Sequence, residues 1–235
     1  IFDGKFGNAE KILVEEFLEG DEMSYFIISD GVSFKSFNTA QDHKRVGEGD
    51  LGENTGGMGA YSPSDLINSE LEAKIINRII KPTLSALKSM QVQYKGFLYA
   101  GLMIKNNDPY LIEYNVRMGD PECQTILPLL KTDLLDIINS CCDKNLEDKK
   151  IEWYDKKSLC IVLCSKGYPK NFKKNIKILN LEDLDEDNNN LIFHAGTNSV
   201  KGKIYANGGR VLNFVSISDE FIKSRNQALE KIKKL

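Results

Sequence analysis

The first hundred residues contain apolar runs whose length and pattern predict β-strands. Ile12–Leu18 starts apolar and turns acidic midway, and Phe97–Ile104 is apolar almost throughout, as a buried strand would be. Between them, Met23–Phe37 holds two strand-like runs separated by Asp30 and Gly31, which can supply the positive φ angles of a tight turn. The pattern therefore predicts two strands and a β-hairpin.

Apolar residues spaced three and four apart predict helices in two further segments. Leu71 and Ile75 belong to an apolar face that predicts a helix from about Ser69 to Met90, with a kink or break at Pro82. Residues 121–142 are expected to form a second helix. Between these helices, a turn after Phe97–Ile104 leads into another strand.

The pattern changes after residue 150 to short apolar strands. These runs are residues 158–164, 191–196, 203–206 and 210–217. Asn207–Gly209 predicts a hairpin, and a last helix is expected to begin near Ser218, which can cap it. We therefore predict an α+β fold with a boundary near residue 150, giving domains 1–150 and 151–235.

A polar, glycine-rich segment from Gln41 to Pro63 has no hydrophobic period and is predicted to be a functional loop. Residues 47–52 fit G-x-G-x-x-G, but they lack the strand and helix that a dinucleotide site requires. Residues 52–59 have the glycine spacing of a P-loop, with Met58 where its lysine belongs. We reject both motifs.

The same segment contains a candidate anion site. His43, Lys44 and Arg45 precede the glycine-rich backbone of Asn54–Gly59, and fixed positive charge beside accessible amides suits a phosphate or carboxylate. An ordinary surface loop with solvated charges explains the local sequence equally well.

Charge and cysteine usage narrow the functional classes. The chain has 31 basic and 34 acidic residues, so its charge balance gives no reason to expect nucleic acid or an anionic membrane as a partner. No apolar run approaches the roughly 20 residues that span a bilayer. Five cysteines without metal-binding spacing and two histidines argue against zinc and indicate reduced thiols of a cytoplasmic protein.

The sequence LIEYNVRMGDPE, residues 111–122, places Glu113, Asn115 and Arg117 at every second position. Side chains of a strand alternate between its faces, so these three share one face, about 7 Å apart. A carboxylate and an amide suit Mg²⁺, and an arginine beside them suits a phosphoryl group. The alternative is a polar sheet face on which Arg117 pairs with Glu113. The opposite row is expected to join the core: Ile112, Tyr114, Val116 and Met118.

Two glutamates near the start of the chain are candidates for nucleotide binding. Glu15 lies inside an apolar segment, where a carboxylate and strand-end backbone can bind an adenine, and Glu22 can hold ribose hydroxyls. The alternative is that Glu15, Glu16 and Glu19 only face solvent.

Together and in this order, four segments resemble the phosphoribosylamine–glycine ligases, also called glycinamide ribonucleotide synthetases. The segments are ILVEEFLEGDEMS, QDHKRVGEGDLGENTGGMGAYSP, GFLYAGLMI and LIEYNVRMGDPE, and KGYP, HAGT and NGGRVL resemble the C-terminal domain of the family. The resemblance spans essentially the whole chain. It implies that residues 1–150 are the C-terminal portion of an ATP-grasp domain, an antiparallel sheet with helices, and that residues 151–235 are a small, mostly-β C-terminal domain.

The resemblance also implies a reaction. The family are ATP-dependent ligases of purine biosynthesis that join glycine to 5-phosphoribosylamine through glycyl phosphate and produce glycinamide ribonucleotide. It implies ATP with Mg²⁺ or Mn²⁺, small-molecule substrates, and no protein, nucleic-acid or membrane partner.

Roles carry over by position. Glu113 and Asn115 match the metal-binding pair, and Arg117 matches the arginine beside the reacting phosphates. The hinge that binds adenine, with the ribose glutamate, corresponds to Glu15, Glu16, Phe17, Leu18 and Glu22. The segment on the substrate side corresponds to His43, Lys44, Arg45, Asn54, Thr55, Gly56 and Gly57.

The family has further segments that do not precede Ile1 here, including phosphate-contacting lysines. We therefore expect a fragment that is inactive alone. Three alternatives stay open: another ATP-grasp carboxylate–amine ligase or a carboxylase, a non-catalytic nucleotide-binding remnant, and one module of a multifunctional purine-synthesis chain.

Overall fold

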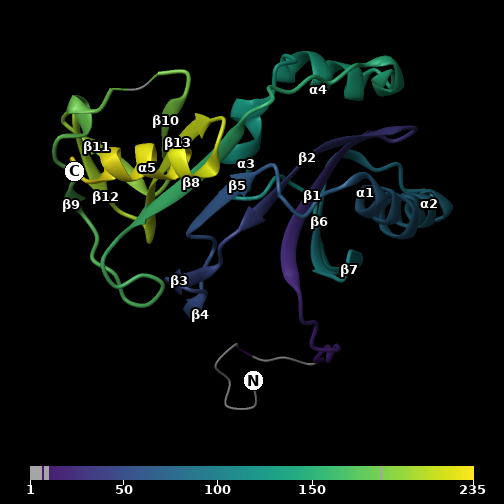
Figure 1. Cartoon of the computed structure of the whole chain (residues 1–235), viewed down its shortest axis with the longest axis horizontal. Helices are drawn as coiled ribbons and strands as arrows, with labels where there is room; N and C mark the ends of the chain where they lie inside the picture. Colours follow the sequence, from purple (N-terminus) through teal and green to yellow (C-terminus); the bar gives the residue numbers. More distant parts are fainter. Residues whose placement is uncertain (1–6, 8–10, 186) are drawn as a thin grey trace.

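The computed structural model describes residues 7, 11–185 and 187–235, which are built around one long antiparallel sheet (Figure 1). Its strands are hydrogen-bonded in the order β10-β13-β8-β5-β2-β1-β6-β7. They are β1 (Asp21–Asp30), β2 (Phe34–Asp42), β5 (Gly59–Ser62), β6 (Lys95–Lys105), β7 (Asp108–Asn115), β8 (Lys157–Cys164), β10 (Asn190–His194) and β13 (Arg210–Ser218). The sheet runs through both predicted domains, because β5 pairs with β8; the boundary near residue 150 stays a prediction.

Smaller sheets and helices surround the long sheet. The smaller sheets are β3 (Arg45–Gly47) with β4 (Leu51–Asn54), and β11 (Thr197–Val200), β12 (Lys203–Ala206) and β9 (Ile176–Lys177). The α-helices are α1 (Ser69–Ile75), α2 (Lys81–Ser89), α3 (Glu122–Ile126), α4 (Leu134–Cys142) and α5 (Phe221–Ile232). A π-helix, η1 (Ile76–Ile80), and three 3₁₀ turns, η2 (Leu127–Leu129), η3 (Leu146–Asp148) and η4 (Leu181–Asp183), complete the elements.

Two apolar clusters cover opposite faces of the β1–β6 pair. Tyr25 and Ile27 of β1 pack with Leu71 of α1, whereas Phe26 packs with Ile137 of α4. Side chains of a strand alternate between faces, so helices on both sides bury β1 completely from Met23 onward. This double cover explains why β1 and the predicted strand Phe97–Ile104 read as continuous apolar runs.

The predicted hairpin is confirmed, but Asp30 has a different role in it. Strands β1 and β2 pair across the turn, and of the two turn residues only Gly31 has a positive φ, of 88°. The Asp30 carboxylate accepts hydrogen bonds from the backbone N–H groups of Val32, Ser33 and Leu146. Burial raises the pKa of Asp30, yet these hydrogen bonds outweigh it and hold the pKa below its ordinary value.

Asp30→Asn is expected to lower the free energy of unfolding by about 2 kcal/mol, because buried amide donors lose a charged acceptor. The lowered pKa means that Asp30 stabilises the fold above the unfolded-state value of about 4 and that this stabilisation is lost as pH falls below it. Urea unfolding at pH 7 and pH 3 measures both effects, with the exposed Asp155→Asn as control. An Asp30→Asn protein as stable as wild type at pH 7 would refute this role.

The helical predictions are partly confirmed. Residues 69–89 are helical, and η1 interrupts the α-helical hydrogen bonding just before Pro82, whose ring would clash with the carbonyl four residues earlier in a regular α-helix. Residues 121–142 form two helices instead of one. Pro128 lies in the 3₁₀ turn after α3, and Asp133 caps a new helix by accepting hydrogen bonds from the N–H groups of Leu135 and Asp136.

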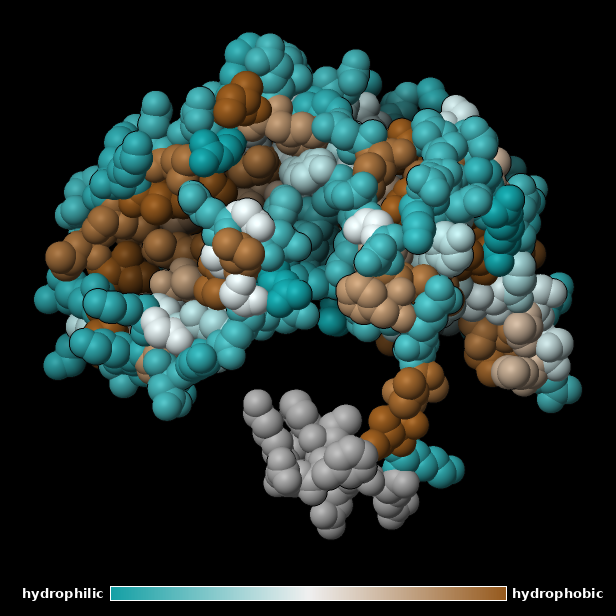
Figure 2. Space-filling model, turned by 60° about the horizontal axis from the view of Figure 1, so that its bottom comes forward, coloured by the Kyte–Doolittle hydropathy of each residue, from teal (hydrophilic) through white to brown (hydrophobic). Residues whose placement is uncertain are grey.

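Two predictions near the start of the chain are wrong. The structure has no strand at Ile12–Leu18, because no described strand pairs with this segment, and Leu13 and Val14 are 81% and 86% exposed. Figure 2 shows a hydrophobic segment that projects from the body of the molecule. The Gln41–Pro63 segment is not one loop, since it contains the end of β2, the β3–β4 hairpin and β5.

The C-terminal strands form as predicted, but two connections differ. Asn207–Gly209 is not a hairpin turn: it passes from β12 in one sheet to β13 in another, and the N–H groups of Asn207 and Gly208 donate to the Gly196 carbonyl. Helix α5 begins at Phe221, because the Ser218 hydroxyl bonds to the backbone of Glu220 and so does not cap the helix.

Candidate active site

The predicted polar face of β7 is present. The Asn115 side-chain Nδ2 donates to Glu113 Oε1 at 3.3 Å, so the two side chains lie on the same side of the strand. Arg117 follows the end of the strand, and its Nη1 donates to the Met118 carbonyl at 2.9 Å. No Arg117–Glu113 ion pair is found among the described residues, so the structure does not support the alternative in which these two side chains pair.

A β-bulge changes the opposite row of β7. Gly101 of β6 pairs with Glu113 and the next residue, Leu102, pairs with Leu111, which leaves Ile112 as the extra residue. Ile112 therefore lines the same small pocket as Glu113 and does not enter the core. Of the four residues predicted for the core, Tyr114 and Met118 pack against it, whereas Ile112 and Val116 are exposed.

Glu113, Asn115 and Arg117 line a cavity of about 160 Å³. The other residues that line it are Asp42, Lys44, Thr55, Gly56, Tyr99, Gly119, Asp120 and Glu122. A groove of about 660 Å³ shares two of these residues, Asp42 and Lys44, and contains most of the other predicted residues. From the predicted sets it is lined by Phe17, Leu18, Glu22, His43, Lys44, Arg45 and Asn54. Figure 2 shows a hydrophilic hollow in the middle of this face.

Three predicted residues lie outside these two spaces. Glu15 and Glu16 are exposed and line neither the cavity nor the groove. Gly57 packs behind the cavity, where a Cβ would lie 2.7 Å from Asp42 Oδ1 and 2.5 Å from Pro121 Cδ. The glycine, at φ 108°, is therefore required for close packing.

Lys44 joins the cavity to the groove. Its Nζ lies 2.6 Å from Glu22 Oε2. Burial lowers the pKa of Lys44, but the hydrogen bond and charge of Glu22, with the nearby Asp42 and Glu113, outweigh it and raise the pKa. Lys44 is therefore a fixed cation at neutral pH.

The sequence analysis missed three carboxylates of the cavity, Asp42, Asp120 and Glu122. Glu122 is 3% exposed and accepts a hydrogen bond from the Ser24 hydroxyl at 3.1 Å, and the Ser24 oxygen lies 2.8 Å from the Tyr99 hydroxyl. A Cβ at Gly119 would lie 2.2 Å from a Glu122 carboxylate oxygen, so the backbone here packs closely around the acid. The only available signal was the position of these three acids inside the conspicuous segments QDHKR and MGDPE.

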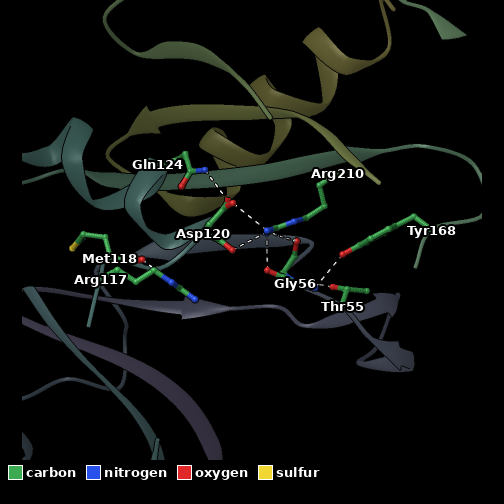
Figure 3. A network of polar contacts seen from close by, with 9 residues as sticks. Thr55, Gly56, Arg117, Met118, Asp120, Gln124, Tyr168 and Arg210 are labelled. Carbon is green, nitrogen blue, oxygen red and sulfur yellow. Dashed lines mark hydrogen bonds and ion pairs between the residues drawn. The ribbon is translucent and has the colours of Figure 1, made fainter. Parts of the chain in front are cut away.

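Arg210 of β13 ties the C-terminal part of the chain to the cavity (Figure 3). Its Nη1 donates to the carbonyls of Gly56 and Asp120, both at 2.7 Å, and its Nη2 lies 3.0 Å from Asp120 Oδ2. Tyr168 adds a contact, because its hydroxyl accepts the Gly56 N–H at 3.1 Å. These contacts hold Gly56 and Asp120, which both line the cavity, and no local sequence pattern predicts them.

The chain has the fold of the ATP-grasp class, with Glu113 and Asn115 on one side of β7 beside a groove. Residues 1–123 match the family model described as Phosphoribosylglycinamide synthetase, ATP-grasp (A) domain. A crystal structure of phosphoribosylamine–glycine ligase from Thermotoga maritima superposes with a TM-score of 0.83 at 34% identity, over 94% of this chain and 54% of that chain.

The chain belongs to the phosphoribosylglycinamide synthetase family, since residues 158–235 also match the model described as Phosphoribosylglycinamide synthetase, C domain. It is 43% identical to phosphoribosylamine–glycine ligase of Brucella melitensis over 99% of this chain and 55% of that protein. It is 42% identical to the trifunctional purine biosynthetic protein adenosine-3 of Gallus gallus over 96% of this chain and 23% of that protein. The chain thus spans about half the length of the ligases that it matches.

Across the described ranges, no helix is long and apolar enough to cross a membrane. All five cysteines are free thiols, as the sequence predicts.

Proposed function

We propose that the full-length protein is an ATP-dependent ligase that joins glycine to 5-phosphoribosylamine through glycyl phosphate. The arrangement of Glu113, Asn115 and Arg117 in one cavity with Lys44, beside the groove at residues 17–22, carries this proposal. It offers oxygen donors and two cations where a nucleotide's phosphates would have to lie. Membership of the family favours this reaction over a carboxylase or a non-catalytic remnant.

Glu113 and Asn115 fit a divalent cation, Mg²⁺ or Mn²⁺. Their side chains are adjacent, and a carboxylate with an amide is a hard-oxygen pair. Within the described residues, no three His, Cys, Asp or Glu side chains are grouped to hold a metal on their own. In nucleotide enzymes, Mg²⁺ usually has one or two protein ligands, and phosphates and water supply its remaining ligands. When bound, the cation would neutralise charge on the phosphates.

The remaining roles follow from charge and position. Arg117 lines the cavity, and its guanidinium would stabilise the phosphoryl group during transfer to the glycine carboxylate. The backbone of Phe17 and Leu18 would bind adenine at the groove, and Glu22 would meet the ribose while it holds Lys44. Glu15 and Glu16 would contribute through the backbone of the same segment. The acyl phosphate would form in the cavity, which favours its protection from water.

On the substrate side, His43, Arg45 and Asn54 line the groove, and Thr55 and Gly56 line the cavity. These residues would face the amine substrate, which brings a phosphate of its own. All proposed substrates are small molecules of the cytoplasm, and the proposal requires no protein partner.

The full-length protein is expected to release ADP only when both glycine and 5-phosphoribosylamine are present with ATP and Mg²⁺. Coupled measurement of ADP tests this, with bicarbonate in place of glycine as the control for a carboxylase. Turnover that depends on bicarbonate and not on glycine would contradict the proposal. We expect the 235-residue chain alone to show no turnover.

A further inference from the structure

Asp42 stands out among the buried polar groups of the cavity. It ends β2, and its Oδ1 is buried without a hydrogen-bond partner. Three other buried side-chain atoms in the described ranges share this condition, and all belong to neutral groups, on Gln124, Ser158 and Asn213. A buried carboxylate oxygen without a donor costs far more free energy than a neutral one, so Asp42 is the group that most needs a partner.

The surroundings of Asp42 favour a cation. The pKa of Asp42 is raised to about 7, mainly by burial and then by the charges of Glu122 and Glu22, which outweigh the lowering by Lys44 and Arg210. The two nearby cations are already bound elsewhere, Lys44 to Glu22 at 2.6 Å and Arg210 to Asp120 at 3.0 Å. The protein therefore leaves this carboxylate short of positive charge.

Packing decides from which side a partner can reach Asp42. Gly57 and Pro121 close one side, where not even a Cβ fits beside Oδ1. Asp42 nevertheless lines the cavity that also contains Glu113, Asn115 and Arg117. A ligand in this cavity can therefore contact Asp42 together with Glu113, Asn115 or Arg117.

We propose that Asp42 binds the ammonium group of the amino-acid substrate and thereby turns its carboxylate toward Glu113, Asn115 and Arg117. This inference rests on the proposed function. Of the groups that the proposed substrates bring (phosphates, hydroxyls, a carboxylate and amines), the amino acid's ammonium is the cation with three N–H donors. An ammonium held by Asp42 keeps its proton, so it is not a nucleophile and does not compete with 5-phosphoribosylamine for the acyl phosphate.

The test compares glycine with glycolate in the full-length protein, since glycolate replaces the ammonium by a hydroxyl of similar size. In Asp42→Asn, kcat/KM for glycine is expected to fall roughly 100-fold, as for loss of one partner of a buried charged pair. The kcat/KM for glycolate as a substrate, or its inhibition constant as a competitive inhibitor of glycine, is expected to change less than about threefold, since glycolate carries no cation for Asp42 to bind. The KM for ATP should stay at the wild-type value, and the exposed Asp155→Asn serves as the matched control.

Equal losses for glycine and glycolate, or an unchanged glycine kcat/KM, would overturn the inference. Wild-type protein without glycine-dependent ADP release would instead refute the proposed function, so the two failures are distinguishable. If Asp42→Asn does not fold, a crystal structure of the wild-type protein with glycine and a non-hydrolysable ATP analogue decides. The glycine nitrogen is expected about 3 Å from a carboxylate oxygen of Asp42, and a nitrogen bound elsewhere overturns the assignment.

Discussion

Glu113→Gln in the full-length protein is expected to lower turnover about 100-fold or more while the protein stays folded. The change removes a negative charge but almost no volume from an exposed position on β7. A divalent cation at a phosphoryl-transfer site is worth several kcal/mol, and each 1.4 kcal/mol is about tenfold in rate. Steady-state ADP release at increasing Mg²⁺ measures the effect, and the Mg²⁺ concentration for half-maximal activity is expected to rise.

Glu147→Gln is the matched control, because Glu147 is also exposed and, in the turn η3, lines neither the cavity nor the groove. Circular dichroism of both variants separates lost turnover from lost folding. A Glu113→Gln protein with wild-type turnover and wild-type Mg²⁺ dependence would remove Glu113 from the ligand set.

Arg117→Met is expected to lower kcat about 100-fold, with Arg117→Lys intermediate between it and wild type. Arg117 lines the cavity, and the hydrogen bond from its Nη1 to the Met118 carbonyl leaves its other donors for a phosphoryl group. Lysine keeps the charge but lacks the planar fork that matches phosphate oxygens. Single-turnover measurements of ADP formation test this step directly.

The control for Arg117 is Arg78→Lys, which alters an arginine that is 59% exposed and paired with Asp108. Exposed pairs contribute little, so this variant is expected to keep wild-type turnover. Equal kcat values for Arg117→Met and wild type would contradict a role in phosphoryl transfer.

The parts of the fold and site that local patterns encode were predictable from the sequence. Alternation placed Glu113 and Asn115 on one face, and the burial of β1 and β6 follows from their apolar runs. The strand predicted at Ile12–Leu18 failed because a strand needs a neighbour for its backbone hydrogen bonds, and an apolar pattern does not supply one. Ile112 was misplaced because a β-bulge depends on the register with β6.

Contacts between distant segments were not predictable. Asp120 and Arg210 are 90 positions apart, and their pairing depends on β8 and β13 extending the same sheet as β2 and β5. Asp42 and Glu122 also meet at the cavity only in the folded chain, because packing brings β2 and α3 together. Only a three-dimensional structure shows that one of these acids has a buried oxygen without a donor.

The most direct test of the central claim is an anomalous-scattering map from crystals of the full-length protein grown with Mn²⁺ and a non-hydrolysable ATP analogue. Mn²⁺ is expected about 2 Å from oxygens of both Glu113 and Asn115 and in contact with the analogue's phosphates. An anomalous peak that touches the phosphates but neither of these side chains would contradict the account.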